Sequence, residues 1–509
     1  MPPVSLAKKL LRGSVISLGE HGVKIAVVFV TTPLMIRHLG EHDYGLWIFA
    51  LAIIGYLRLL DLGLSLTGNR FLGHAIGTGE AGRYYDHFVA FSYLFNRIGL
   101  ASLLLTLALV LLAPVILPGD ERISEGRWIL LGLGFLTSIH FWTQVHTLVL
   151  KSHLRYDWIG AASIAKTVVQ GAVLIVLLSR GHGLYSLVLA FLLTDLLDQI
   201  LLIFLSRRVY PEGGFLFVRR RPPGLAPILR FSGTAVLASL GNQFRNGIDP
   251  LIIGHFAGLP LVPIYSIGSR FLSLFTDLIN AVFGGNFLAA FSQLDGRRDQ
   301  DGLTRHFLTS LRFSTAFASA GGGFLVLFGP AFIERWIGPG FADSGKVLLL
   351  LAGPTTLMLM QYPVGNFFYS RNLQRWLVYT GLGGGLFNAI LSTCLVLKIG
   401  FFGVVWGTFI ELVLHFGIAV PLLTARSCGL KLRTYLGRLF RSALPYLLLL
   451  GLFAAIIPPY TTPAFGRLFL LGSVFALFLT ATFWGVTLTA EERTLLRQHL
   501  ARFGRSSAS

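Results

Sequence analysis

Residues 98–112 of this chain read Ile98-Gly-Leu-Ala-Ser-Leu-Leu-Leu-Thr-Leu-Ala-Leu-Val-Leu-Leu112. The run carries no charge and does not alternate between apolar and polar residues, so it predicts a helix rather than a half-buried strand. Similar runs recur along the chain, and their length of about twenty residues is what a helix needs to cross a bilayer. Because unpaired backbone amides are costly in hydrocarbon, spanning segments must be helices or a closed barrel, and continuous apolar runs favour helices.

The composition excludes an ordinary soluble domain. Of 509 residues, 54% are hydrophobic and 13% are charged, whereas soluble domains carry roughly 25% charged residues. The net charge of +19 would suggest nucleic acid in a soluble protein, but here topology signals explain it better, and no nucleic-acid partner is expected. Cys394 and Cys428 indicate neither a disulfide framework nor a metal site. Nucleophile, zinc and phosphate-loop signatures are absent from the sequence, so we expect no catalytic residue, metal or cofactor.

The apolar runs predict an all-α fold, a polytopic transmembrane helix bundle of about fourteen spans. The expected spans are 14–36, 44–66, 88–112, 129–149, 159–178, 185–205, 230–256, 262–284, 308–328, 346–369, 376–397, 402–423, 442–457 and 465–486. The expected domains are an N-terminal six-helix lobe (1–206), a basic cytoplasmic linker (207–228), a C-terminal six-helix lobe (229–424), and two additional helices with an amphipathic tail (425–509). The tail begins with a capping-box pattern from Thr489 to Glu492, which predicts a helix on the inner leaflet.

The basic residues predict the orientation of the spans. With the N-terminus inside, 27 Lys and Arg residues fall in cytoplasmic segments and 8 on the opposite side. A miscounted span would invert every later loop, so the asymmetry favours fourteen spans with both termini cytoplasmic. Gly213 and Arg297 are then expected inside the cell, and Gly119 and Asp343 outside.

The two six-span halves resemble each other. Residues 32–40, Thr-Pro-Leu-Met-Ile-Arg-His-Leu-Gly, match residues 249–255, Asp-Pro-Leu-Ile-Ile-Gly-His, with Gly258 shortly after. Tyr44 and Tyr265 open the spans that follow. Six is an even number, so both halves enter the membrane in the same direction, which is typical of transporters built from parallel repeats. Chance similarity between two apolar strings is the alternative.

Charged residues inside spans are the candidate functional residues, because each costs at least ~2.5 kcal/mol at the bilayer centre unless it is paired or hydrated. They gather in spans one, two, seven and eight, the first two of each half: Glu20, Lys24, Arg58, Asp61, Arg245, Asp249, Arg270 and Asp277. If these spans line a shared cavity, its wall would be cationic and polar, and Pro33 and Pro250 would bend two of its helices. Static salt bridges that only fix packing are the alternative. Asp195 and Asp198 are expected at hydrated positions near the cytoplasmic end of span six.

Two motifs carry a resemblance to a known family. They are residues 32–47, Thr-Pro-Leu-Met-Ile-Arg-His-Leu-Gly-Glu-His-Asp-Tyr-Gly-Leu-Trp, and residues 59–65, Leu-Leu-Asp-Leu-Gly-Leu-Ser. Both are similar to the start of the polysaccharide, or lipid-linked oligosaccharide, flippases of the multidrug/oligosaccharidyl-lipid/polysaccharide exporter superfamily. The layout of six, six and two spans resembles that family over the whole chain.

The resemblance implies a transporter rather than an enzyme. Its substrate would be an undecaprenyl-diphosphate-linked oligosaccharide, carried by alternating access across the bacterial inner membrane for O-antigen, capsule or exopolysaccharide assembly. The implied partners are membrane lipids, the polyprenyl-diphosphate-linked glycan, and assembly proteins such as a polysaccharide polymerase. A diphosphate needs cationic partners, for which the candidates are Lys24, Arg58, Arg245 and Arg270. The candidates for ion coupling are Glu20, Asp61, Asp249 and Asp277.

Other functions stay open at this point. The lipid II flippase of peptidoglycan synthesis shares the same plan. A multidrug/cation antiporter of the superfamily would need a mainly acidic or aromatic cavity, whereas this chain balances its acids with arginines. A membrane polymerase or ligase would need a sizeable outside loop with Arg and His, which the expected loops do not provide.

Overall fold

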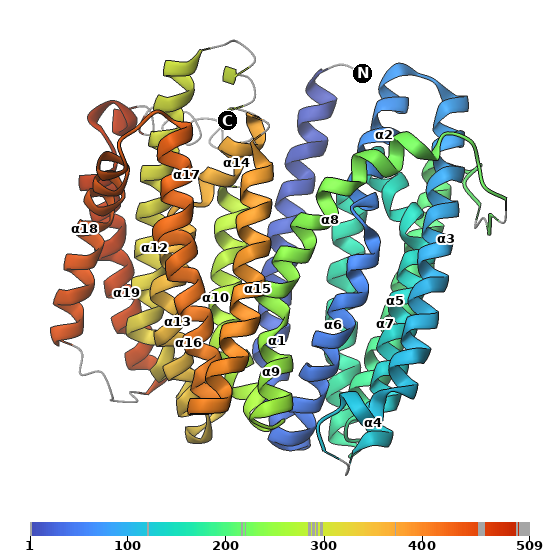
Figure 1. Ribbon diagram of the computed structural model, residues 1–509, viewed down its shortest axis with the longest axis horizontal. Helices are drawn as coiled ribbons and strands as arrows, with labels where there is room; N and C mark the ends of the chain where they lie inside the picture. The colour runs from blue at the N-terminus through green and yellow to red at the C-terminus, as the bar shows by residue number, and fades with distance from the viewer. Residues whose placement is uncertain are drawn as a thin grey trace, which may run out of the picture. The chain divides into compact units, whose positions relative to one another are not determined.

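The computed structural model describes residues 3–119, 122–214, 217–218, 220–283, 287, 291, 294–295, 299–371, 373–456, 464–494 and 497. These residues are almost entirely helical and include no strand (Figure 1), which confirms the all-α transmembrane class. The chain forms two compact units, residues 1–263 and 264–509. The domain boundaries expected from the sequence stay a prediction.

The first unit contains the helices up to α9. They are α1 (Pro3–Leu57), the short 3₁₀ helix η1 (Arg58–Asp61), α2 (Leu64–Thr78), α3 (Ala81–Leu111), α4 (Ala113–Ile116), α5 (Ile123–Ser152), α6 (Tyr156–Ser179), α7 (Tyr185–Val209), α8 (Leu225–Gly247) and α9 (Asp249–Phe256). Helix α5 packs against α1, α2, α3 and α7, and α6 packs against α1 and α7. Helix α5 is therefore the centre of this bundle.

The second unit begins with α10. Its helices are α10 (Leu261–Phe283), α12 (Gln300–Ile337), η2 (Pro339–Phe341), α13 (Ala342–Met360), α14 (Tyr362–Ser370), α15 (Gln374–Ile399), α16 (Phe401–Leu414), η3 (His415–Ala419), α17 (Val420–Ser427), α18 (Leu432–Ile456), α19 (Phe465–Thr482) and η4 (Phe483–Thr487). Helix α12 packs against α13, α18 and α19, and α16 packs against α13 and α15.

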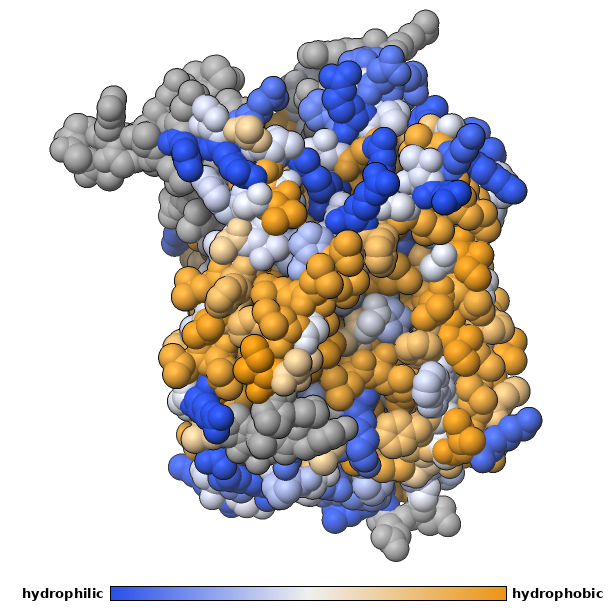
Figure 2. Space-filling view, turned by 90° about the vertical axis from the view of Figure 1, so that its left-hand side faces the viewer, coloured by the Kyte–Doolittle hydropathy of each residue, from blue (hydrophilic) through white to orange (hydrophobic). Residues whose placement is uncertain are grey.

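Eleven helical segments of the described residues are long and apolar enough to cross a membrane. One of them, Gly19–Thr78, has 60 residues, whereas a single crossing needs about twenty. Figure 2 shows, on the face that carries α18 and α19, a broad apolar belt between two bands of hydrophilic residues. The chain is thus a multi-pass membrane protein, while the count of fourteen spans stays a prediction.

Two glycines turn the chain at matching places. Gly40 adopts φ 76° within the long helix α1 and separates its two halves, and Gly258 adopts φ 105° between α9 and α10. Both angles lie in the left-handed region, which residues with a Cβ adopt at a cost. The buried Tyr44 and Tyr265 follow these turns. The geometry therefore matches the sequence repeat, in which Gly40 and Gly258 end corresponding segments.

The second expected span is broken rather than continuous. Helix α1 ends at Leu57, η1 covers Arg58–Asp61, and Leu62 and Gly63 have φ angles of 48° and 71° before α2 begins. The apolar run at residues 44–66, interrupted by the charges of Arg58 and Asp61, predicts one continuous span. The left-handed pair Leu62 and Gly63 separates η1 from the next helix, which begins at Leu64.

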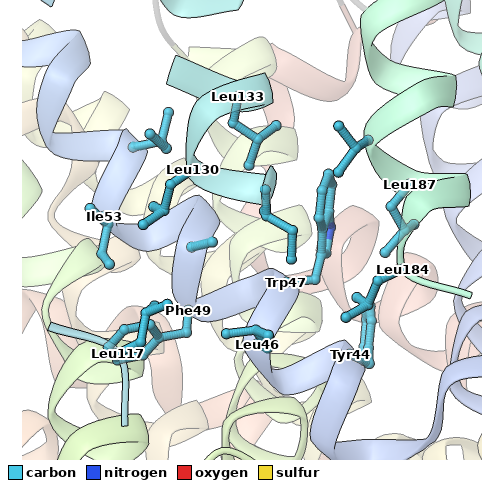
Figure 3. Close-up of a cluster of buried hydrophobic side chains, with 14 of the residues drawn as sticks. Tyr44, Leu46, Trp47, Phe49, Ile53, Leu117, Leu130, Leu133, Leu184 and Leu187 are labelled. Carbon is cyan, nitrogen blue, oxygen red and sulfur yellow. The ribbon is translucent and has the colours of Figure 1, made fainter. Parts of the chain in front are cut away.

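An apolar cluster forms the core of the first unit at its α4 end. Figure 3 shows side chains of α1, α5 and α7 converging there, with Trp47 beside Leu187 and Phe49 near Leu117. The cluster includes Ile54 of α1 and Leu133 of α5. These two residues also line the cavity described below, so the core forms the apolar part of the cavity wall.

The expected capping box is confirmed at the end of the second unit. Thr489 Oγ1 accepts a hydrogen bond from the Glu492 amide at 3.3 Å, and Glu492 Oε2 accepts one from the Thr489 amide at 2.8 Å. These reciprocal bonds satisfy two of the free amides at the start of a helix. The apolar tail residues that follow, Leu495, Leu496, Leu500 and Phe503, lie outside the described residues.

Candidate functional site

A polar cavity of about 560 Å³ lies inside the first unit. Its lining residues come from the helices α1, α2, α5, α6 and α7 and from the 3₁₀ helix η1. Its polar and charged lining residues are Arg58, Asp61, Ser65, Thr137, His140, Gln144, Lys166, Gln170, Asp195 and Gln199. Polar and charged groups inside a bundle this apolar cost free energy. The cavity is therefore the candidate site for a transport function.

Asp61 is positioned by the break between η1 and α2. Its carboxylate accepts a hydrogen bond from Ser65 Oγ at 2.6 Å and a longer one from the Ser65 amide at 3.4 Å. A carboxylate at a helix N-terminus also interacts favourably with the helix dipole. Gln144 on α5 donates to Ser65 Oγ at 2.8 Å, so the cap extends across to the central helix. The motif Leu-Asp-Leu-Gly-Leu thus builds a corner of the cavity.

Lys166 of α6 holds two carboxylates of α7. Its ammonium group pairs with Asp195 and lies 3.9 Å from an oxygen of Asp198. The hydrated helix-end position expected for the two aspartates is wrong, because both lie beside Lys166 within the bundle and Asp195 lines the cavity. Sequence alone could not reveal this, since Lys166 and Asp195 meet only when α6 and α7 pack.

Uncharged polar groups complete the cavity wall. Gln199 accepts a hydrogen bond from Thr143, and its amide nitrogen lies 3.4 Å from His140 Nδ1. The Gln144 Oε1 and Gln170 Nε2 atoms are buried without a hydrogen-bond partner among the described residues. Buried polar atoms are usually satisfied, so these two are available to a solute or to water in the cavity.

Arg58 is the cavity cation that remains available. It has no ion-pair partner in the part of the chain that the structure describes, whereas Lys166 is held by Asp195. The two cations and the carboxylates of Asp61 and Asp195 balance formally. Among the described residues, Arg58 is therefore the cavity cation without an ion pair, whereas Asp61 is bonded to Ser65 and Asp195 to Lys166.

Glu20 and Lys24 are not among the lining residues of this cavity. The two side chains form an ion pair within α1, with 2.5 Å between Lys24 Nζ and Glu20 Oε1. Ser163 of α6 donates a second hydrogen bond to Glu20 at 2.6 Å. The spacing of four residues predicted that they share a helix face, and the structure adds Ser163 as the partner that ties α1 to α6.

Arg245 and Asp249 stand on either side of a second helix break. Helix α8 ends at Gly247, and α9 starts at Asp249 with Pro250 in its first turn. Asp249 is 1% exposed and lies near enough to Tyr56 to interact with it electrostatically. The Tyr56 hydroxyl is buried without a hydrogen-bond partner among the described residues. This part of the seventh span therefore packs beside the second span, as the cavity hypothesis requires.

Gln243 of α8 strengthens this connection. A Cβ added at Gly55 would lie 2.9 Å from Gln243 Nε2, so the Gln243 amide packs directly on Gly55. Gly55 in turn lines the cavity. The seventh span is thus next to the cavity wall, although its charged residues do not line the cavity itself.

The remaining two candidates are on α10. Arg270 and Asp277 are both exposed and belong to the second unit. They are two turns apart on their helix, and neither forms an ion pair with any other described residue. Of the eight candidates, the structure brings Arg58 and Asp61 together in one cavity and places Arg245 and Asp249 near Tyr56.

Sequence reasoning missed the contribution of α5. Thr137, His140, Phe141 and Gln144 all line the cavity. Their spacing of three and four residues places them on one face of the helix. A polar stripe of this kind in an otherwise apolar span is visible in the sequence, but it carries no formal charge, so the clustering of charged residues does not reveal it.

Removal of Lys166 is expected to destabilise the protein. Lys166→Met leaves the Asp195 and Asp198 carboxylates without their cation, and the partial exposure of these side chains limits the loss to about 2 kcal/mol. Thermal unfolding of the purified protein should therefore shift to lower temperature, and Asp195→Asn in addition should restore part of the shift. Lys398→Met, at the exposed end of α15, is the control. A variant as stable as the parent would contradict a structural role for this pair.

The sequence of this chain matches that of a known protein family. The family model described as "Polysaccharide biosynthesis protein" matches residues 34–344, which is more than half of the chain. The chain belongs to the polysaccharide biosynthesis protein family. The matched region includes η1, α2 and every residue of the cavity wall.

Two relatives align with most of this polysaccharide biosynthesis family member. The chain is 24% identical over 431 residues to the succinoglycan biosynthesis transport protein ExoT of Rhizobium meliloti (strain 1021), covering 80% of this chain and 82% of ExoT. It is 20% identical over 413 residues to the uncharacterized membrane protein EpsK of Bacillus subtilis (strain 168), covering 80% and 81%.

The fold is similar to that of a solved flippase. The lipid II flippase MurJ in an inward closed conformation matches 93% of this chain and 98% of its own, with a TM-score of 0.72 and 14% sequence identity. At this identity the likeness shows the fold alone. This fold agrees with the family match and with the relative ExoT, which is a succinoglycan biosynthesis transport protein.

Proposed function

We propose that this protein is a flippase that moves an undecaprenyl-diphosphate-linked oligosaccharide across the bacterial inner membrane for polysaccharide biosynthesis. The observation that carries the proposal is the polar cavity of the first unit, on whose wall Arg58 has no ion-pair partner among the described residues. Two findings support a glycan as cargo: the chain belongs to a polysaccharide biosynthesis family, and its relative ExoT is a succinoglycan biosynthesis transport protein.

The chemistry of the cavity suits a diphosphate head group. A guanidinium can donate two parallel hydrogen bonds to phosphate oxygens, and such bonds are stronger where water is scarce. His140, Gln144 and Gln199 add uncharged polar groups of the kind that bind sugar hydroxyls. Leu51, Ile54 and Phe191 make part of the cavity wall apolar.

The transport cycle would be one of alternating access. Breaks such as those at Leu62–Gly63 and at Ile248 are common at substrate and ion sites of transporters, because half-helix ends can bind ions. Asp61 and Asp249 lie at these two breaks and are the candidates to couple an ion to the cycle. Lys24, Arg245 and Arg270 remain candidate substrate ligands, and Glu20 and Asp277 remain candidate coupling residues. The basic residues favour an orientation with both termini cytoplasmic.

Reconstitution tests the function directly. In proteoliposomes that contain the purified protein, a fluorescent undecaprenyl-diphosphate-linked oligosaccharide should become accessible to an outside quencher far faster than in protein-free vesicles. The same vesicles are offered lipid II and a fluorescent organic cation. Movement of lipid II alone would replace the proposal by a peptidoglycan flippase, and movement of the cation alone would replace it by a multidrug antiporter.

A further inference from the structure

A second polar pocket, of about 300 Å³, lies in the second unit between α12 and α18. It shares no residue with the cavity of the first unit. Its lining residues are Arg305, Leu308, Thr309, Leu311, Arg312 and Thr315 of α12, with Arg438, Arg441 and Ser442 of α18. Four arginines thus surround one small volume, and the function proposed above uses none of them.

One carboxylate neutralises one of these arginines. Glu492, just after α19, pairs with Arg312, while Arg305, Arg438 and Arg441 have no ion-pair partner within the described ranges. Partial burial acts to raise the pKa of Glu492, but hydrogen bonds with Thr489 and the charge of Arg312 outweigh this effect and lower it. Glu492 therefore stays ionised near neutral pH, and three positive charges remain without a counter-ion.

Two hydrogen-bond donors on the pocket wall are also unsatisfied. The Arg312 Nε atom and the Thr315 hydroxyl are buried without a partner among the described residues, and Thr315 is 0% exposed. Buried donors without acceptors are rare and destabilising. A ligand that suits this pocket must therefore be an anion that accepts several hydrogen bonds, as a phosphate group does.

The surface next to the pocket indicates where such a phosphate comes from. Leu444, Leu448 and Leu452 follow Arg441 along α18 at helical spacing, and all three are exposed, Leu448 to 65%. They lie on one face of the helix with Arg441. An exposed apolar stripe on α18 thus begins one helical turn from the pocket residue Arg441. A free ion would not use this stripe, whereas the acyl chains of a lipid would.

We propose that this pocket binds the phosphodiester head group of an anionic phospholipid, whose acyl chains lie along the Leu444, Leu448 and Leu452 stripe of α18. Arg305, Arg438 and Arg441 supply the charge that selects an anionic over a zwitterionic head group. Glu492 pairs with the fourth arginine, Arg312, and so lowers the affinity of the pocket for an anionic head group.

Native mass spectrometry of the full chain in detergent tests this site. Phosphatidylglycerol should bind the parent at least tenfold more tightly than phosphatidylcholine. The double variant Arg438→Gln/Arg441→Gln should lose this preference, whereas Arg426→Gln/Arg433→Gln, with the same change of charge nearby, should keep it. Glu492→Gln should bind phosphatidylglycerol more tightly, because glutamine retains the capping box but releases Arg312.

Two results would overturn the proposal. Equal binding of phosphatidylglycerol to the two double variants would mean that the pocket is not the site. Full displacement of phosphatidylglycerol by millimolar inorganic phosphate would mean that the pocket binds a free anion rather than a lipid. If the double variant at Arg438 and Arg441 does not fold, the single change Arg305→Gln, at an exposed position, replaces it. The binding of phosphatidylglycerol and its displacement by inorganic phosphate are then measured on this variant.

Discussion

Transport of the lipid-linked oligosaccharide is expected to fall about 100-fold in Arg58→Ala, while the folded protein remains in the membrane at normal abundance. Arg58 lies on the cavity wall and has no ion-pair partner among the described residues. Its removal therefore strands no buried carboxylate in the free protein, and the loss falls on the bound diphosphate. The measurement is the initial rate of flipping in proteoliposomes.

The conservative change at this position separates charge from geometry. Arg58→Lys should recover only part of the rate, because a compact ammonium group cannot donate two parallel bonds to a phosphate as a guanidinium does. Arg180→Ala, at the exposed end of α6, is the control and should transport at the parental rate. Normal transport by Arg58→Ala would remove the cationic cavity from the mechanism.

Asp249→Asn is expected to fold and bind substrate but to lose at least tenfold in transport. Asp249 is 1% exposed and begins α9 directly after the helix break, with Pro250 behind it. A carboxylate at such a break can exchange a pairing partner for a proton or Na⁺, and two charge states could bias two conformations of the protein. Flipping assayed across a pH or Na⁺ gradient measures the effect. Asp343→Asn, on the exposed surface of α13, is the control.

A static pair between Asp249 and Arg245 makes the opposite forecast. Removing one partner of a buried pair strands the other charge at a cost of about 3–5 kcal/mol, which should lower the stability of Asp249→Asn. The double variant Asp249→Asn/Arg245→Gln would then regain both stability and transport. Under the switch hypothesis the double variant stays inactive, so full transport by it would exclude the switch.

The family assignment needed little of the tertiary structure. The motifs at residues 32–47 and 59–65 were enough to name the superfamily, and the family match begins at residue 34. The expected spans 14–36 and 44–66 also left Gly40 between two helices, and α1 turns there. They did not predict that Leu62 and Gly63 break the helix, because an apolar leucine carries no signal for a left-handed φ angle of 48°.

The helices themselves follow from the sequence for a physical reason. Each span satisfies its backbone hydrogen bonds internally, so its presence depends only on local runs of apolar residues such as 98–112. The capping box from Thr489 to Glu492 is equally local, and it formed as expected. The alternation of basic residues between loops supplies an orientation for the same reason, since each loop is read by itself.

The candidate sites, in contrast, depend on contacts between distant residues. Lys166 meets Asp195 and Gln144 meets Ser65 only because α6, α7, α2 and α5 pack together. Arg312 meets Glu492 across 180 residues of chain. Such pairings depend on which helix faces meet, and helix faces in lipid are chosen by close packing and polar contacts rather than by local propensity. The sequence by itself therefore determined the all-α transmembrane class and the family, and only the tertiary structure decided which charges share a cavity.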